Sequence, residues 1–314
     1  MKFVTALLNA ARVKALGVPE WHAEVTTAQQ IKAVQLAEQL GFVKVKVPEH
    51  FAIPADHIEL SGDHYPHATT ALSFLAGVTT KIQLASGITI LPLVHPIAQA
   101  KMWATLDWLS NGRAVMNVGV GWLKEEFDLM GVDFEHRGAI CEEQIQAMLA
   151  IWTNEVASYE GKYFQFKDIA ASPRPERKGG IPIWFGGDVD AVLRRVARYG
   201  AGWQPFLTKP DQLPAKMDYI RSQKDYHGRP IELCYSMSNL KLGDGHVALE
   251  APPEAFGKQD VGYMLDIVGK LTELGVTETM LQSPPLASYE AYLDWMRWVS
   301  EEIMPKAGAA KVAA

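Results

Sequence analysis

The chain has 314 residues, 48% of them hydrophobic and 21% charged, with a formal net charge of −6. This mild acidity argues against a nucleic-acid-binding surface, and no apolar run approaches the roughly 18 residues of a membrane span. The N-terminus reads as a first strand rather than a signal peptide, because it lacks a long apolar stretch followed by a cleavage site.

From the N-terminus onward, short β-rich runs alternate with runs whose apolar residues recur at helical spacing, as Ala33, Leu36, Ala37 and Leu40 do. The sequence predicts eight strands, at residues 2–8, 42–47, 82–91, 114–118, 181–185, 202–205, 231–238 and 277–282. It also predicts eight helices, at residues 26–40, 68–80, 96–109, 138–152, 189–196, 212–226, 261–274 and 289–296.

Eight repeated βα units predict parallel strands joined by helical crossovers, and they match a (β/α)₈ TIM barrel. A doubly wound open sheet is the alternative, since strand count alone does not establish closure. We expect one domain over residues 1–306 and a disordered Ala-rich tail over 307–314. Two long insertions, 49–66 after the second strand and 155–180 before the fifth, are typical of segments that build or cover a site.

Motifs of several enzyme classes are missing. The sequence contains no GxSxG, HExxH or P-loop pattern. Its two cysteines, Cys141 and Cys234, stand far apart with no metal-binding spacing, so we expect free thiols, no metal site and a cytoplasmic protein.

In a closed barrel, reactive side chains gather where strands end. Glu49 and His50 follow the second strand, and a carboxylate beside an imidazole can move a proton near neutral pH. Neighbours on an extended chain point in opposite directions, so we expect one of the two to face the mouth. A loop ion pair is the structural alternative. Ser86 and Gly87 interrupt a β-branched run, which indicates a bulge, a close approach to a ligand or a packing glycine.

Glycines follow two later strands. Gly121 and Trp122 come after the fourth strand, where a flat ring or a phosphate could approach the backbone, although Trp122 could equally belong to the core. The pattern lacks the third glycine and the downstream acid of a dinucleotide fingerprint. Gly186 and Gly187 precede a predicted helix, and two glycines there indicate an anion site at its N-terminus. We interpret Asp188 as the N-cap of that helix.

Five stretches resemble a known family: 87–96 (GITILPLVHP), 104–113 (ATLDWLSNGR), 117–122 (NVGVGW), 182–187 (PIWFGG) and 198–203 (RYGAGW). Together they resemble the luciferase-like monooxygenase superfamily, closest to its branch of deazaflavin (coenzyme F420)-dependent oxidoreductases. The resemblance covers nearly the whole chain. It implies a barrel, commonly a homodimer, that binds a flavin-type ring at the carboxyl ends of its strands.

The resemblance also assigns roles to residues. Ser86–Gly87 matches a non-proline cis peptide that backs the ring, and Thr89 matches a position that contacts the ring or its polar edge. Gly186 and Gly187 together match the phosphate loop.

Two further positions concern catalysis. His50 matches the histidine near the centre of hydride transfer, and Glu49 stands for its neighbouring carboxylate. Trp122 departs from the family, because F420-dependent dehydrogenases often carry a glutamate there.

The leading hypothesis is hydride transfer between coenzyme F420 and a small organic substrate, an apolar carbonyl, alcohol or unsaturated compound. Phe51, Trp122, Trp203 and Phe206 indicate an apolar substrate pocket. Alternatives are an FMNH₂-dependent monooxygenase on the same fold, a non-catalytic flavin-binding barrel, and an aldolase or isomerase without a redox cofactor.

Overall fold

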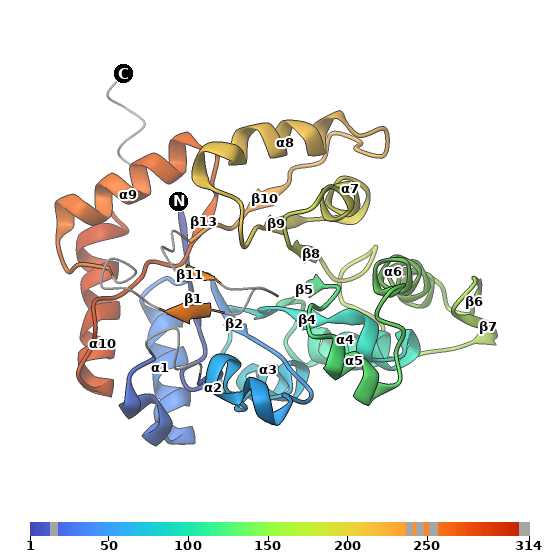
Figure 1. Ribbon diagram of the computed structural model, residues 1–314, viewed down its shortest axis with the longest axis horizontal. Coiled ribbons are helices and arrows are strands. Elements are labelled where there is room, and N and C mark those ends of the chain that lie inside the picture. Colours follow the sequence, from blue (N-terminus) through green and yellow to red (C-terminus); the bar gives the residue numbers. More distant parts are fainter. Residues whose placement is uncertain (13–17, 237–240, 243–247, 251–256, 308–314) are drawn as a thin grey trace.

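A computed structural model describes residues 1–12, 18–236, 241–242, 248–250 and 257–307 of the chain (Figure 1). Parallel strands form its centre, and helices surround them. The barrel strands are β1 (Lys2–Ala6), β2 (Lys44–Val47), β3 (Gln83–Ser86), β5 (Ala114–Gly119), β8 (Ile183–Gly186), β9 (Gly202–Gln204), β10 (Glu232–Leu233) and β13 (Glu278–Thr279). They are hydrogen-bonded in the order β10-β9-β8-β5-β3-β2-β1-β13, and the short strand β4 (Thr89–Ile90) also pairs with β5.

The two ends of this order meet and close the ring. Cys234 and Glu278 form a parallel bridge between the end of β10 and β13. Two backbone hydrogen bonds flank it, from Thr277 N to Leu233 O at 2.9 Å and from Tyr235 N to Glu278 O at 3.0 Å. The predicted (β/α)₈ barrel is therefore confirmed, and the doubly wound open sheet is wrong.

Each barrel strand leads into a helix of the outer layer. These helices are α1 (Thr27–Gln39), α3 (Ala68–Ala76), α4 (Pro96–Leu109), α6 (Arg137–Thr153), α7 (Asp190–Tyr199), α8 (Leu213–Ser222), α9 (Val261–Glu273) and α10 (Tyr289–Trp298), which a π-helical turn (Val299–Ile303) extends. In the described part of the chain, no helix is long and apolar enough to cross a membrane.

Local sequence sets where several of these helices begin. At α1, the Thr26 hydroxyl accepts from Gln29 N while the Gln29 side chain accepts from Thr26 N, a reciprocal capping box. Asp260 and Ser288 cap α9 and α10 with a single hydrogen bond each, accepting from a backbone N–H three residues on. Hence these helices begin within one residue of the predicted starts.

The insertions carry structure of their own. Residues 49–66 contain a 3₁₀ turn (Ala55–His57) and the short helix α2 (Ile58–Ser61). Residues 155–180 form the hairpin of β6 (Ala157–Glu160) and β7 (Gln165–Ile169), which projects beside α6 (Figure 1). Glu143 of α6 holds the hairpin turn by accepting from the backbone N–H groups of residues 162–164.

Several predicted elements differ from those in the structure. Helix α5 (Lys124–Met130) lies between β5 and α6, where no helix was expected. Within the described part of the strand expected at 231–238, pairing covers Glu232–Leu233 and the Cys234 bridge. Residues 237 and 238 of that range lie outside the described residues. A second hairpin follows, formed by β11 (Lys241–Leu242) and β12 (Ala248–Glu250). We expected a disordered tail from residue 307, but Ala307 is buried and its N–H donates to Ile303 O. Residues 308–314 lie outside the described part of the chain.

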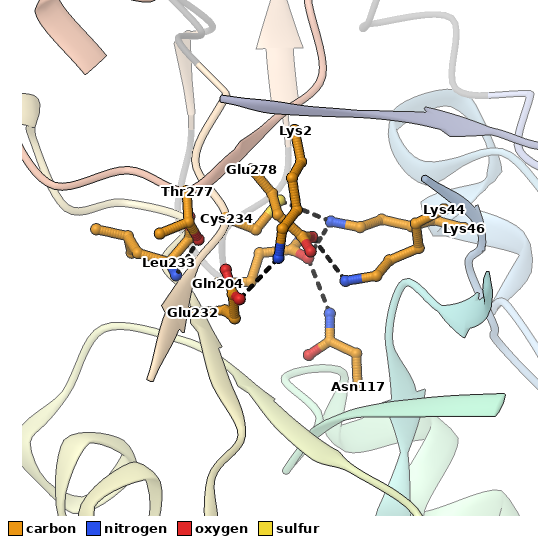
Figure 2. A network of polar contacts seen from close by, with 10 residues as sticks. All are labelled: Lys2, Lys44, Lys46, Asn117, Gln204, Glu232, Leu233, Cys234, Thr277 and Glu278. Atoms are coloured by element: carbon orange, nitrogen blue, oxygen red, sulfur yellow. Dashed lines mark hydrogen bonds and ion pairs between the residues drawn. The ribbon is translucent and has the colours of Figure 1, made fainter. Parts of the chain in front are cut away.

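The barrel interior is partly polar. An apolar group of Val4, Ala85, Val115, Trp184 and Cys234 fills part of it. Around this group lies a network of polar side chains, drawn in Figure 2, in which Lys44 and Lys46 extend from β2 towards partners on other strands. The larger apolar core lies between the strands and the helices.

Candidate functional site

A bulge interrupts the third barrel strand at its mouth end. From the Ala85–Val115 pair to the Thr89–Val118 pair, the chain of β3 and β4 uses one residue more than β5 does. The Ser86 hydroxyl bridges this break: it donates to Asn117 O at 2.8 Å and accepts from Asn117 N at 3.0 Å. The bulge predicted at Ser86–Gly87 is present, and the Ser86 side chain is used within it.

The cis peptide bond is Gly87–Ile88, so the expected position, Ser86–Gly87, is wrong by one residue. Ser86 still pairs with Val47, and Gly87 N still donates to Val47 O at 2.7 Å, so the break in the ladder falls one residue later than expected. The backbone leaves the ladder only after Gly87.

Glycines at the ends of β5 and β8 make room for the residue that follows this bond. A Cβ on Gly119 would collide with Ile88 Cδ1, and one on Gly186 would lie 3.0 Å from Ile88 Cγ2. The half-buried Ile88 side chain therefore lies against the ends of β5 and β8, at two positions that carry no side chain. Gly121 has a φ of 81°, and a Cβ there would lie 2.5 Å from the Phe127 ring, so the turn into α5 requires glycine.

His50 lies just beyond the end of β2 and is paired with a carboxylate 76 residues away. Its Nδ1 is 2.8 Å from Glu126 Oε2. The other Glu126 oxygen accepts from Phe51 N at 2.5 Å and Ala52 N at 3.3 Å, and the Glu126 side chain is fully buried. A carboxylate only accepts, so His50 carries its proton on Nδ1. Nε2, the other ring nitrogen, has no hydrogen-bond partner within the described residues.

Aromatic side chains surround this imidazole. The Tyr65 ring lies 4.8 Å from the His50 ring, and the Trp122 ring lies 6.1 Å away, both edge-on. Phe51 and Trp122 are half-buried here. Trp203, expected in the same pocket, is fully buried in the outer core, and its indole donates to Gly187 O. That expectation is wrong, because Trp203 pairs with Phe185 and faces the helices as Phe185 does.

Glu49 points away from its neighbour. Its Oε2 accepts from Ala68 N, the first residue of α3, at 3.0 Å, while Oε1 is buried without a partner in the described part of the chain. Burial raises the pKa of Glu49 to about 7. The two residues thus point in different directions, as expected, and Glu126 rather than Glu49 is hydrogen-bonded to His50.

The loop after β8 differs from expectation in two details. Asp188 is not the N-cap of α7; its carboxylate accepts from Phe206, Leu207 and Thr208 N–H groups and so holds the loop after β9. Gly187 N already donates to Gln204 O. The first turn of α7 has no side-chain cap, and Val192 N already donates to Val189 O at 2.8 Å. Only the N–H groups of Asp190 and Ala191 have no partner among the described residues, so the anion site stays a prediction.

The mouth fits a planar ring cofactor in two respects. Gly119 and Gly186 form a cradle that seats the half-buried Ile88 side chain, against which a flat ring could lie. Near it, Asn117 Oδ1 is a buried polar atom with no partner among the described residues, and a ring N–H could satisfy it. Thr89 Oγ1 is also buried and has no partner in the described part of the chain, but its register with Val118 places it on the helix-facing side of the barrel. Its expected ring contact stays a prediction.

Sequence reasoning missed Glu126 and the polar residues beneath the mouth, namely Lys46, Asn117 and Gln204. A signal for Lys46 existed, since two lysines alternating on a buried strand must share one face. For Glu126 the sequence offered two consecutive acids, of which only the second is buried.

Relatives in sequence cover most of the chain. An uncharacterized protein of Mycobacterium tuberculosis is 31% identical over 273 residues, 82% of this chain and 88% of its own. The FMNH(2)-dependent dimethylsulfone monooxygenase of Pseudomonas putida is 26% identical over 205 residues, 64% of this chain and 55% of its own.

Solved structures share the fold. The monooxygenase RslO1 of Streptomyces bottropensis superposes with a TM-score of 0.75 at 23% identity, covering 97% of this chain and 99% of its own. The coenzyme F420-dependent tetrahydromethanopterin reductase of Methanopyrus kandleri gives 0.71 at 18% identity, covering 97% and 98%. The model of the luciferase-like monooxygenase family matches residues 1–242. The chain therefore belongs to the luciferase-like monooxygenase family.

Proposed function

We propose that the chain is a two-electron oxidoreductase that holds a flavin-type cofactor at the barrel mouth and acts on a small apolar substrate beside His50. The observation that carries this proposal is the His50–Glu126 pair. It lies at the end of β2, the strand whose Val47 pairs with Ser86 at the start of the bulge. A proton-transfer group and a cradle for a planar ring thus share one rim.

His50 would move the substrate proton. With Nδ1–H held by Glu126, Nε2 can take a proton from an alcohol or, once protonated, give one to a carbonyl oxygen. The imidazolium that forms would be stabilised by the Glu126 carboxylate at 2.8 Å. Tyr65 and Trp122 would exclude water and favour an apolar substrate.

The cofactor, when bound, would supply or accept the hydride. Gly119, Gly186 and Ile88 would support its ring, and Asn117 would meet a polar edge. Its phosphate would lie at the first turn of α7, where Lys216 Nζ donates to Asp188 O at 2.5 Å and brings a positive charge. Ser86, Gly87, Gly121 and Gly187 support the site through the backbone in this proposal. Trp122 would form part of the wall.

Names of relatives support both cofactors, since one names FMNH(2) and one names coenzyme F420. Hydride transfer with F420 and monooxygenation with FMNH₂ are therefore both within the proposal. The homodimer and the cytoplasmic location stay predictions; sedimentation of the purified protein tests the first.

The test is to titrate the purified protein with FMN and with F420, each oxidised and reduced. We expect at least one of these four cofactor forms to bind well below millimolar concentration. If none of the four binds, the proposal is wrong. His50→Ala should keep cofactor binding and lower turnover on a panel of small ketones, alcohols and unsaturated carbonyls. His136→Ala, an exposed histidine, is the matched control. Unchanged turnover in His50→Ala would move the proton-transfer role to another residue.

A further inference from the structure

A thiol and an amine lie side by side inside the barrel (Figure 2). Lys46 Nζ lies 3.0 Å from the sulfur of Cys234, the residue after β10, and 2.7 Å from Gln204 Oε1. Cys234 is 2% exposed and Lys46 is 9% exposed, so the pair is largely shielded from solvent. The fold thus brings together two reactive groups that stand 188 positions apart in the chain.

The backbone fixes both ends of this pair. Cys234 N donates to Trp203 O at 3.0 Å, and Cys234 forms the parallel bridge with Glu278 that closes the barrel. Lys46 lies within the ladder of β2 and β3, where it pairs with Ala85. The two side chains therefore stay within reach of each other while the barrel is closed.

Lys44, on the same face of β2, has a different environment. Its Nζ is 2.6 Å from the Glu278 carboxylate and 3.7 Å from the centre of the Trp184 ring. The partners of Lys46 are an amide oxygen and the thiol sulfur, and no carboxylate of the described residues forms an ion pair with it. Of the two lysines, the one placed against the thiol is therefore the one that is not paired with an acid.

This arrangement suits a known reaction of oxidised cysteine. A peroxide converts a thiol to a sulfenic acid, whose sulfur can then be attacked by a nitrogen to give a sulfenamide. Such a step needs the reacting atoms about 3–3.5 Å apart. Lys46 Nζ already lies 3.0 Å from Cys234 Sγ.

We infer that Lys46 captures oxidised Cys234 as a reversible sulfenamide cross-link. Hydrogen peroxide first oxidises the thiol: an S–O bond forms, the O–O bond breaks and one water leaves. The Lys46 nitrogen then attacks the sulfur, an S–N bond forms, the S–O bond breaks, and the hydroxyl leaves with a proton from the nitrogen as a second water. The pair has lost two hydrogens, and one peroxide has been reduced. A dithiol reverses the reaction, releasing thiol and amine and becoming a disulfide.

The cross-link has two consequences. A sulfenic acid that finds no partner can proceed to a sulfinic acid, which thiols do not reduce, so capture by Lys46 protects Cys234 from irreversible oxidation. Capture also removes the positive charge that Gln204 Oε1 meets beneath the mouth. No cofactor takes part, so the inference stands apart from the proposed function.

The test is peptide mapping by mass spectrometry after treatment of the purified protein with hydrogen peroxide, at a dose that oxidises the exposed Met130. We expect trypsin to stop cleaving after Lys46. A peptide joining Lys46 to Cys234 should appear, with the summed mass of its two halves less two hydrogens. Dithiothreitol should restore both the cleavage and an alkylatable Cys234.

Two variants and an internal control locate the effect. Lys46→Arg keeps a cation beside the sulfur but offers no amine for capture, so Cys234 should gain oxygen that dithiothreitol does not remove. Lys44→Arg changes the neighbouring lysine, and the cross-link should form as before. Cys141 is the control within every sample: it is 1% exposed, burial raises the pKa of its thiol to about 12, and it should stay alkylatable.

Several results would overturn the inference. One is a Cys234 thiol that survives the peroxide, and another is its oxidation to a sulfinic acid while trypsin still cleaves after Lys46. A linked peptide that keeps an oxygen between the two residues also overturns the direct S–N bond. All three are read from the unaltered protein, so they decide the matter even if a variant fails to fold. Because no cofactor is added, the inference and the proposed function can fail separately.

Discussion

Two carboxylates of this barrel are buried against a nitrogen base, at opposite ends of β2. Glu278 meets Lys44 at the start of the strand, 2.6 Å apart, and Glu126 meets His50 just beyond its end, 2.8 Å apart. The first pair is closed on every side, with side chains 2% and 3% exposed and the Trp184 ring 3.7 Å from the ammonium. In the second pair the carboxylate is fully buried, but the imidazole side chain is 13% exposed.

The difference shows how one structural device serves two purposes. Where both partners are buried, the pair can only hold strands together, here β2 against β13 beside the bridge that closes the ring. Where one partner keeps an atom free and reachable, the carboxylate orients a group that can exchange a proton. Breaking each pair should therefore affect a different property.

Glu126→Gln should have the largest effect, on turnover. Both Glu126 oxygens face donors. In the variant, the amide oxygen keeps the backbone N–H groups, so its NH₂ turns to His50 Nδ1 and the imidazole proton moves to Nε2. That nitrogen can then no longer act as a base, and we expect turnover to fall by a factor of about 10² to 10⁴. Nitrogen NMR of the imidazole reads the tautomer directly.

Glu125→Gln, at the exposed neighbouring acid, is the control and should change neither tautomer nor turnover. An unchanged tautomer in Glu126→Gln would show that the carboxylate does not orient His50.

Lys44→Met should have the next largest effect, on stability. It leaves the Glu278 carboxylate buried and unpaired, which lowers the free energy of unfolding by about 3–5 kcal/mol. Burial lowers the pKa of Lys44 because it disfavours the charged ammonium, and the Glu278 carboxylate opposes this effect. Urea unfolding measures the loss. Combining Lys44→Met with Glu278→Leu should recover most of it, and a double variant as unstable as the single one would contradict the pairing argument.

Glu49→Gln should change how stability depends on pH. Burial raises the pKa of Glu49 from 4.5 to about 7, so between these values the folded protein holds a proton that the unfolded chain has released. Stability should therefore fall as pH rises through this window, by about 3 kcal/mol in total. The variant should lack this slope and be the more stable protein at pH 8, as urea unfolding at pH 5 and pH 8 would show.

Glu38 provides the control for that experiment. Although burial opposes it, hydrogen bonds from the backbone of Ile82, Lys81 and Thr80 lower the pKa of Glu38 to about 2. Its contribution is present above pH 4.5 and is lost only as pH falls towards 2. Glu38→Gln should thus leave the slope between pH 5 and pH 8 as it is, and an equal loss of slope in both variants would disprove the assignment to Glu49.

The fold could be predicted because each βα unit repeats two short-range patterns, apolar spacing along helices and β-branched runs in strands. Boundaries failed where tertiary contacts set them. Helix α5 follows a glycine-rich turn, and its own first turn carries three charged residues. Only Glu126 and Phe127 of this helix are buried, so its apolar spacing is too short to indicate a helix. The expected strand 82–91 is two strands, because a bulge depends on the partner strand as well as on the sequence.

The candidate site was predicted as far as single strand ends allow. His50, the bulge and the glycines after β5 and β8 could be found because barrel geometry brings strand ends together. The partner of His50 could not, since Glu126 contacts it across 76 positions. Nor could the orientation of Asn117, which depends on Lys46 and Gln204 from two other strands. Adjacent residues suggested a Glu49–His50 unit, whereas the fold separates them and pairs His50 with another acid.

Lys2→Met should have the smallest effect and completes the comparison with an exposed pair. Lys2 Nζ lies 2.7 Å from Glu232 Oε1, a distance between those of the two buried pairs, but the side chains are 46% and 35% exposed. Water and salt screen such a pair, so its loss should lower the free energy of unfolding by about 0.2–1 kcal/mol, and by less at high salt. A loss as large as that of Lys44→Met would mean that distance alone, and not burial, determines what an ion pair contributes to this barrel.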